Sequence, residues 1–147
     1  MEIRGTAHPP APSGGGRGCA ADLSAAEIRN TNIGGRPLLD EHDASARVGT
    51  CLASWPGSNG ELRIAARVDD PATQREVRNG TLRGLSLGTD MILDEGGEVL
   101  FRGQAELSLC AEGKRPNTWV DTINGKTVHR HHRASRGLSG AAAASLA

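Results

Sequence analysis

A succession of short strand-like runs constrains the fold of this chain more than any other feature. Each run alternates apolar with polar side chains over a few residues, which is the pattern of a half-buried β-strand. The runs are residues 47–55, 61–68, 81–91 and 98–110, with less regular ones at 118–121, 126–129 and 2–7. Asn59-Gly60 and Gly96-Gly97 lie between runs and are typical of hairpin turns. The chain is therefore predicted to be mostly β-sheet.

Two segments carry helix signals instead. Residues 71–79 begin with Pro71 after Asp70 and end before Gly80, and these residue types start and stop helices. Residues 22–30 are the second candidate. Together with the strands, these segments predict a small β-rich α+β fold with one or two helices.

The length of 147 residues suits one compact domain. Residues 9–18 combine Pro with four Gly, which predicts a mobile loop because Pro removes backbone donors and Gly is costly to order. Residues 133–147 contain two isolated Leu and no apolar periodicity, which predicts a flexible C-terminal tail. We therefore expect the folded domain to span residues 1–132.

Composition argues against several classes of protein. Seventeen Lys plus Arg balance seventeen Asp plus Glu, so the chain lacks a basic surface for nucleic acid or anionic lipid, and aromatic residues, at 2%, are too few for base stacking. No apolar run is long enough to span a membrane, and the N-terminus lacks a signal peptide, so we expect an unsecreted protein without nucleic-acid or membrane partners. Cys19, Cys51 and Cys110 are odd in number and show no C-x-x-C spacing, so we expect neither a disulfide framework nor a zinc site. We also expect no other metal and no cofactor.

Ser86 lies in the most informative stretch, Gly84-Leu85-Ser86-Leu87-Gly88. On a strand, both Leu face one side and Ser86 faces the other with the two Gly, because side chains alternate. The serine would then be flanked by empty space through which a substrate backbone can reach its hydroxyl. The G-x-S-x-G pattern also matches the nucleophile elbow of α/β-hydrolases, but this chain has little room for their parallel sheet. A tightly packed glycine-rich strand without catalytic function is the other interpretation.

A serine nucleophile needs a base within hydrogen-bond reach, usually a histidine held by a third group. His42 precedes the strand expected at 47–55, where a loop residue can point into a cleft, although an ordinary turn histidine fits as well. The cluster His129, His131 and His132 lies among arginines near the tail, which favours a solvated basic stretch. His42 is therefore the better candidate base.

Glu106 is the candidate third group. Alternation places Glu106 on one strand face and Leu107 and Leu109 on the other. If residues 95–97 form a three-residue hairpin loop, the register places Ser86 opposite Glu106. A two-residue loop would instead place Ser86 opposite Leu107, and the sequence leaves both registers open. A glutamate on a solvated strand face is the alternative to a catalytic one.

In chain order these segments resemble the capsid maturation proteases of viruses, namely the herpesvirus assemblins and the prohead proteases of tailed phages. LLDEHDASARVG at 38–49 resembles the family's histidine segment, and residues 61–80 resemble the strand and helix before its serine. GLSLG at 84–88 is similar to the phage G-L-S-I-G and the assemblin L-S-L-S around the nucleophile. ELSLCAEGKR at 106–115 is similar to both branches, and the resemblance covers about residues 38–120.

The resemblance implies a mostly antiparallel, β-barrel-like domain with serine endopeptidase activity. Ser86 would be the nucleophile, His42 the general base and Glu106 the third member of the triad. Assemblins have a second histidine at that third position, whereas phage proteases have an acid, so this chain is similar to the phage branch there.

The resemblance also implies an oxyanion hole at Gly113-Lys114-Arg115, which corresponds to the assemblin G-R-R. Lys114 replaces the first Arg, which should matter little if its backbone N–H binds the oxyanion. Glu41 replaces the Asn that usually precedes the phage histidine, and this leaves the hydrogen bonding around His42 open.

The substrates implied by the family are the scaffold protein and extensions of the major capsid protein, inside an immature procapsid in the infected host cell. The protease's own tail is a further implied substrate, because Ala134-Ser135 and Ala144-Ser145 resemble the bonds that assemblins cleave. A homodimer is implied by the assemblin resemblance alone. The alternatives are a small serine esterase and a non-catalytic, capsid-associated β module in which Ser86 is merely packed.

Overall fold

The computed structural model describes residues 1–12 and 22–128 of the chain. The strands in these residues are β1 Glu2–His8, β2 Pro37–Asp40, β3 Asp43–Pro56, β4 Leu62–Val68, β5 Gly84–Leu93, β6 Val99–Cys110, β7 Val120–Ile123 and β8 Lys126–Thr127, and the helices are α1 Ala25–Asn30 and α2 Pro71–Asn79. Residues 9–12 form no helix or strand. The rest of the loop expected at 9–18, the histidines 129, 131 and 132, the expected tail and its two Ala-Ser bonds lie outside the described residues.

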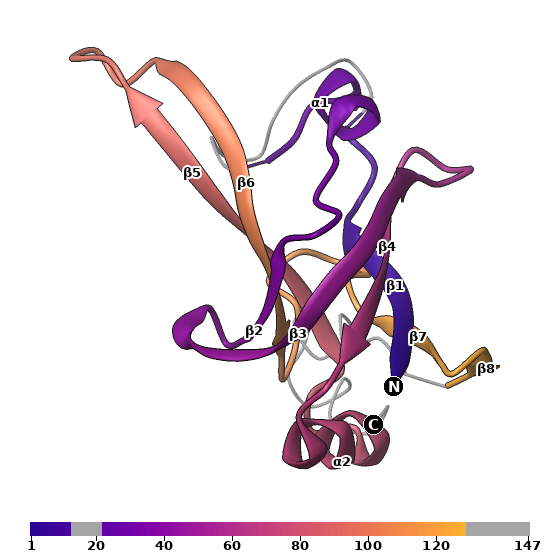
Figure 1. The fold of residues 1–147 in the computed structure, drawn as a ribbon. Coiled ribbons are helices and arrows are strands. Elements are labelled where there is room, and N and C mark those ends of the chain that lie inside the picture. The colour runs from indigo at the N-terminus through magenta and orange to yellow at the C-terminus, as the bar shows by residue number, and fades with distance from the viewer. Residues whose placement is uncertain (13–21, 129–147) are drawn as a thin grey trace, which may run out of the picture.

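All of these strands belong to one sheet, in the spatial order β5-β6-β2-β3-β4-β1-β7-β8. Neighbouring strands are antiparallel, except that β2 and β6 run parallel. The sheet curls until its β5 edge reaches the chain just before β7, where the Leu85 N–H donates to the Thr118 carbonyl (3.1 Å) and the Val120 N–H to the Arg83 carbonyl (2.9 Å). Figure 1 shows this curled sheet with α1 near one end and α2 at the other. The predicted β-rich, mostly antiparallel and barrel-like α+β fold is confirmed.

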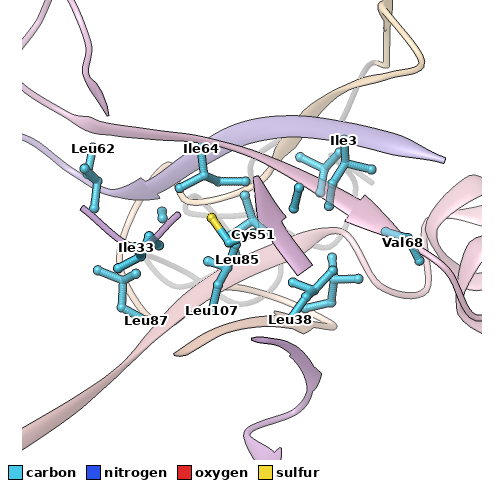
Figure 2. Close-up of a cluster of buried hydrophobic side chains, with 14 of the residues drawn as sticks. Ile3, Ile33, Leu38, Cys51, Leu62, Ile64, Val68, Leu85, Leu87 and Leu107 are labelled. Atoms are coloured by element: carbon cyan, nitrogen blue, oxygen red, sulfur yellow. The ribbon is translucent and has the colours of Figure 1, made fainter. Parts of the chain in front are cut away.

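Aliphatic side chains fill the interior of the curled sheet. Leu85 and Leu87 on β5 and Leu107 and Leu109 on β6 are at most 7% exposed. Figure 2 shows three of these leucines gathered with Ile64 of β4 between the strands. Because side chains alternate along a strand, the residues between these leucines face the outside of the sheet. The polar candidates for a functional site therefore lie on the outer face.

Helix α2 spans the residues predicted for it. Asp70 caps its N-terminus by accepting the Thr73 N–H (2.9 Å), and Gly80 ends it in the left-handed conformation at φ +86°. Val77 of this helix is fully buried in the core cluster. The helix therefore packs on the sheet through the side that carries Val77.

Helix α1 begins later than predicted, at Ala25 rather than at residue 22. Ser24 forms a capping box with Glu27: the Ser24 Oγ accepts the Glu27 N–H (3.2 Å), and the Glu27 Oε1 accepts the Ser24 N–H (2.9 Å). Strand β2 was not predicted, because four residues are too few to show alternation.

In residues 1–12 and 22–128, no helix has the length and apolar character needed to cross a membrane.

His8, at the end of β1, is a buried polar residue that ties β1 to the segment before α1. It is 2% exposed, its Nε2 accepts the Leu23 N–H (3.0 Å), and its Nδ1 donates to the Pro9 carbonyl (2.6 Å). A backbone N–H can only donate, so the Nε2 must be unprotonated. Burial lowers the pKa of His8 from its ordinary value of 6.5, which favours this neutral form.

We predict that His8 lowers the free energy of unfolding in acid. Since the pKa of His8 is lower in the folded than in the unfolded chain, the unfolded state binds more protons below about pH 6.5, and stability is lost as the pH falls. Between about pH 7 and 5, urea unfolding should show a steeper loss of unfolding free energy in the wild type than in His8→Gln. Equal slopes in the two proteins would contradict this assignment.

Candidate active site

Ser86, His42 and Glu106, the three candidate residues, lie together on the outer face of the sheet. The His42 Nε2 is 3.0 Å from the Ser86 Oγ, and the His42 Nδ1 is 2.6 Å from the Glu106 Oε1. A carboxylate can only accept, so the Nδ1–H donates to Glu106, and the Nε2 of the neutral ring accepts the Ser86 hydroxyl. The three side chains therefore form one chain of hydrogen bonds.

Exposure to solvent differs along this chain of hydrogen bonds. Ser86 is 6% exposed and the Glu106 side chain 13%, whereas the His42 side chain is 43% exposed. The acid is therefore shielded from water, which strengthens its hydrogen bond to the imidazole. A molecule that approaches from solvent meets the imidazole first.

A tight turn between β2 and β3 positions His42. Asp40 pairs with Asp43, and the two residues between them, Glu41 and His42, both have left-handed backbones at φ +50° and +62°. This is the backbone of a two-residue hairpin turn that usually contains glycine or asparagine. Non-glycine residues adopt it at a cost of order 1–3 kcal/mol each, so surrounding contacts must hold the turn in place.

Contacts to β6 hold this turn. The parallel pairing of β2 with β6 ends at Asp40 opposite Leu109, and the Glu41 N–H then donates to the Leu109 carbonyl (2.9 Å). The Glu41 Oε1 accepts the Ala111 N–H (2.8 Å), just after the end of β6. Glu41, which departs from the phage pattern, therefore anchors the turn to β6 through both its main chain and its side chain.

The register of the β5–β6 hairpin differs from both predicted registers. Ser86 pairs with Ser108, and Glu106 pairs with Gly88. The Asp94 N–H donates to the Glu98 carbonyl (2.8 Å), which fits the three-residue loop, but the register then shifts by one residue at two places, Gly88/Thr89 and Ile92/Leu93. Two shifts of one residue preserve the side-chain face. Glu106 therefore stays on the face of Ser86, two pairs further along, and His42 contacts both side chains.

The prediction of empty space beside Gly84 and Gly88 is wrong. A Cβ at position 88 would overlap the Glu106 carboxylate, and a Cβ at position 84 would overlap the backbone of Gly113. The absence of side chains at these two positions therefore admits the candidate acid and the candidate oxyanion loop to either side of Ser86.

The loop that holds Lys114 and Arg115 lies against the start of β5. Its Gly113 packs on Gly84, the Thr118 Oγ1 donates to the Arg115 carbonyl (2.7 Å), and Lys114 is exposed. The Arg115 Nε donates to the Asp22 Oδ1 (2.9 Å), and the Arg115 side chain is only 17% exposed. The structure thus brings the loop to the neighbourhood of Ser86, and the binding of an oxyanion there stays a prediction.

Ser108 is a site residue that sequence reasoning did not single out. Its Oγ donates to the Glu106 Oε2 (2.9 Å) and accepts the His42 main-chain N–H (3.0 Å). The available signal was its position two residues after Glu106 on the same polar strand face. Asp43, the residue after His42, accepts hydrogen bonds from the side chain and the main chain of Ser45 instead, and these bonds lower the pKa of Asp43.

The described cysteines do not offer a competing nucleophile. Cys51 and Cys110 are buried and unpaired, and burial raises the pKa of Cys51 to about 11 and that of Cys110 to about 12. A thiolate is the reactive form of cysteine, so both thiols are inert near neutral pH. Among the described residues, Ser86 is thus the hydroxyl or thiol that shares a chain of hydrogen bonds with a histidine and an acid.

Comparison with known proteins identifies the class of fold. No protein-family model matches the chain, and no curated protein does. The solved structures that the chain matches include herpesvirus proteases. The chain therefore has an assemblin-like fold, as its sequence segments predicted.

Three of these solved structures are of the protease of Kaposi's sarcoma-associated herpesvirus (KSHV). Its complex with a hexapeptide phosphonate inhibitor has a TM-score of 0.57 at 18% sequence identity, covering 81% of this chain and 63% of that protease chain. Another structure of KSHV protease has a TM-score of 0.51 at 17% identity and covers 99% of this chain and 70% of its own. A complex with a dimer disruptor has a TM-score of 0.52 at 17% identity, covering 81% and 74%. This chain thus spans 63% of the length of the first of these proteases.

We predict different outcomes for alanine at the two glycines beside Ser86. In Gly88→Ala the new Cβ meets the end of a flexible side chain, so Glu106 rotates away from His42 while the fold survives. In Gly84→Ala the Cβ meets backbone, which cannot move aside cheaply, so thermal stability falls. Reaction of Ser86 with a fluorophosphonate should slow by about 10-fold or more in Gly88→Ala, because the base loses its orientation.

Gly96→Ala is the matched control, since its Cβ would meet nothing closer than the Asp94 Oδ1 at 3.5 Å. This control should keep both the labelling rate and the thermal midpoint. A Gly88→Ala protein that reacts as fast as the control would show that the position of Glu106 does not matter to Ser86.

Proposed function

We propose that this protein is a serine endopeptidase that matures viral procapsids. The observation that carries the proposal is the chain of hydrogen bonds from Ser86 through His42 to Glu106, on a fold shared with herpesvirus proteases. A hydroxyl held by a histidine, whose second nitrogen is held by an acid, is the arrangement that activates serine for acyl transfer. Because the solved structures that share this fold include proteases, we propose that the acyl group comes from a peptide bond.

The mechanism follows from the direction of the hydrogen bonds. The Ser86 Oγ attacks a peptide carbonyl carbon while its proton passes to the His42 Nε2, and Glu106 stabilises the imidazolium through the Nδ1–H. His42 then gives the proton to the leaving amine as the C–N bond breaks, which leaves an ester on Ser86. Water, deprotonated by His42, hydrolyses the ester and restores the hydroxyl.

The oxyanion of this reaction would be bound by the loop at Lys114 and Arg115. Support comes from the packing of the Gly113 main chain on Gly84, which is two residues before Ser86 on β5. One hydrogen-bond donor to an oxyanion is worth about 10²–10³ in rate. The hydrogen bond of Arg115 to Asp22 would keep this loop in one position.

The substrates we propose are the scaffold protein and extensions of the major capsid protein, cleaved inside the procapsid in the infected cell, together with the Ala-Ser bonds of the protease's own tail. We further propose that the protein forms a homodimer. KSHV protease, whose fold it shares, has been solved with dimer disruptors.

We predict that Ser86→Ala and His42→Ala each abolish peptide cleavage without unfolding the protein, since neither side chain belongs to the core. Because triad residues act as a unit, the double variant should be little worse than either single one. A fluorophosphonate should label the wild type at Ser86. Cleavage should be measured on a quenched fluorescent peptide library and on scaffold protein. Ser58→Ala, an exposed serine in the β3–β4 turn, is the control and should keep full activity.

The same experiment separates the other functions. If the wild type is not labelled, both the endopeptidase and the esterase proposals are contradicted, and the capsid-associated β module is favoured. Labelling with turnover of short-chain esters but no peptide cleavage would favour the esterase.

We also predict that Glu106→Gln lowers kcat by about 10²–10⁴ while KM changes little. A neutral amide keeps the size of the side chain and its position beside Gly88, but it cannot stabilise the imidazolium or fix the tautomer. Steady-state kinetics on a cleaved peptide would measure the loss. Wild-type kcat in this variant would mean that Glu106 is only a strand-face residue.

A further inference from the structure

Ser108 is a fully buried hydroxyl that lies between the two residues that must orient Ser86. It is 0% exposed and sits on β6 opposite Ser86, two residues after Glu106. Its Oγ contacts both the Glu106 Oε2 (2.9 Å) and the His42 main-chain nitrogen (3.0 Å). One buried atom thus links the strand that holds the acid to the turn that holds the base.

The chemistry of the partners sets the direction of both hydrogen bonds. The His42 N–H can only donate, so the Ser108 Oγ accepts it, and the Glu106 carboxylate can only accept, so the Ser108 hydroxyl donates to it. A serine hydroxyl has one proton and two lone pairs, which suits this pair of roles. Replacing the hydroxyl with hydrogen, as in alanine, would leave the His42 N–H without this partner and a Glu106 carboxylate oxygen without its donor, which is costly.

These two bonds restrict two motions that would break the His42–Glu106 contact. The first is rotation of the carboxylate: with the Oε2 held by Ser108, the Oε1 is the oxygen left for the His42 Nδ1. The second is opening of the turn, whose left-handed residues Glu41 and His42 need external contacts to stay in place. The main-chain N–H of His42, the second of these left-handed residues, donates to the Ser108 Oγ.

We infer that Ser108 is a positioning residue, whose Oγ fixes the His42 main chain and the Glu106 carboxylate together so that the Nδ1–H points at the Oε1 and the Nε2 at Ser86. The inference rests on the proposed serine protease function, in which a displacement of about 1 Å in a reacting group costs about 10²-fold in rate. Ser108 does not touch the reacting atoms, so its loss acts on kcat through His42.

The test compares Ser108→Ala, Ser108→Cys and Thr73→Val with the wild type. Thr73 is the matched control, because it is 3% exposed and its Oγ1 donates to the Asp70 Oδ2 (2.8 Å) at the N-terminus of α2, away from the site. The Thr73→Val substitution therefore removes a hydrogen bond from a buried hydroxyl to a carboxylate without changing the contacts of His42. Three quantities are measured: kcat and KM on a cleaved peptide, the rate at which a fluorophosphonate labels Ser86, and the proton NMR signal of the His42 Nδ1–H.

We expect Ser108→Ala to lower kcat and the labelling rate by about 10–100-fold with KM nearly unchanged, and its Nδ1–H signal to be lost by faster exchange with water. Ser108→Cys, which keeps a weak donor and acceptor, should recover part of both rates. Thr73→Val should lose thermal stability but keep both rates and the NMR signal.

Wild-type rates and an unchanged Nδ1–H signal in Ser108→Ala would overturn the inference, and so would an equal loss of rate in Thr73→Val. The labelling rate and the NMR signal do not need a peptide substrate. If the wild type is labelled at Ser86 but cleaves no peptide, the endopeptidase proposal fails, while these two readouts still decide whether Ser108 positions His42.

Discussion

Strand β2 has only four residues, Pro37–Asp40, yet the rest of the structure depends on its pairing. It is antiparallel to β3 on one side and parallel to β6 on the other, from Leu38 opposite Leu107 to Asp40 opposite Leu109. This parallel ladder joins the β5–β6 hairpin to the other five strands along the sheet. It also places the turn that follows β2 beside the strand that carries Glu106. The continuity of the sheet and the assembly of the candidate site therefore both depend on the pairing of β2 with β6.

A strand of the sheet can serve the core and the site together because its two faces are independent. Leu85 and Leu87 fill the interior, while Ser86 between them faces outward toward His42. The two register shifts in the hairpin keep this arrangement, since a single shift would have set Leu107 opposite Ser86 and turned Glu106 inward. An ionised glutamate in that aliphatic interior would be strongly destabilising. Burial of the leucines thus helps to select the register on which the candidate site depends.

The core and the site place different demands on the sequence, which accounts for a shared fold at 16–18% identity. An aliphatic interior accepts many combinations of Leu, Ile, Val and Ala of similar total volume, so residue identity can drift while the pattern of burial persists. The site depends on particular atoms instead. Only glycine at position 88 leaves room for the Glu106 carboxylate, and the small hydroxyl of Ser108 donates to that carboxylate while it accepts from the His42 main chain.

The sequence by itself determined most strands, the capped helix α2 and the polar face that carries Ser86 and Glu106, because alternation and capping depend on residues close together in the chain. The position of His42 before a strand and the resemblance to capsid maturation proteases both indicated it as their partner. Only the tertiary structure decided the parallel pairing of β2, the two shifts of register and the left-handed turn at His42. Each of these depends on contacts between residues far apart in sequence, where packing and hydrogen bonds to another strand outweigh any local preference.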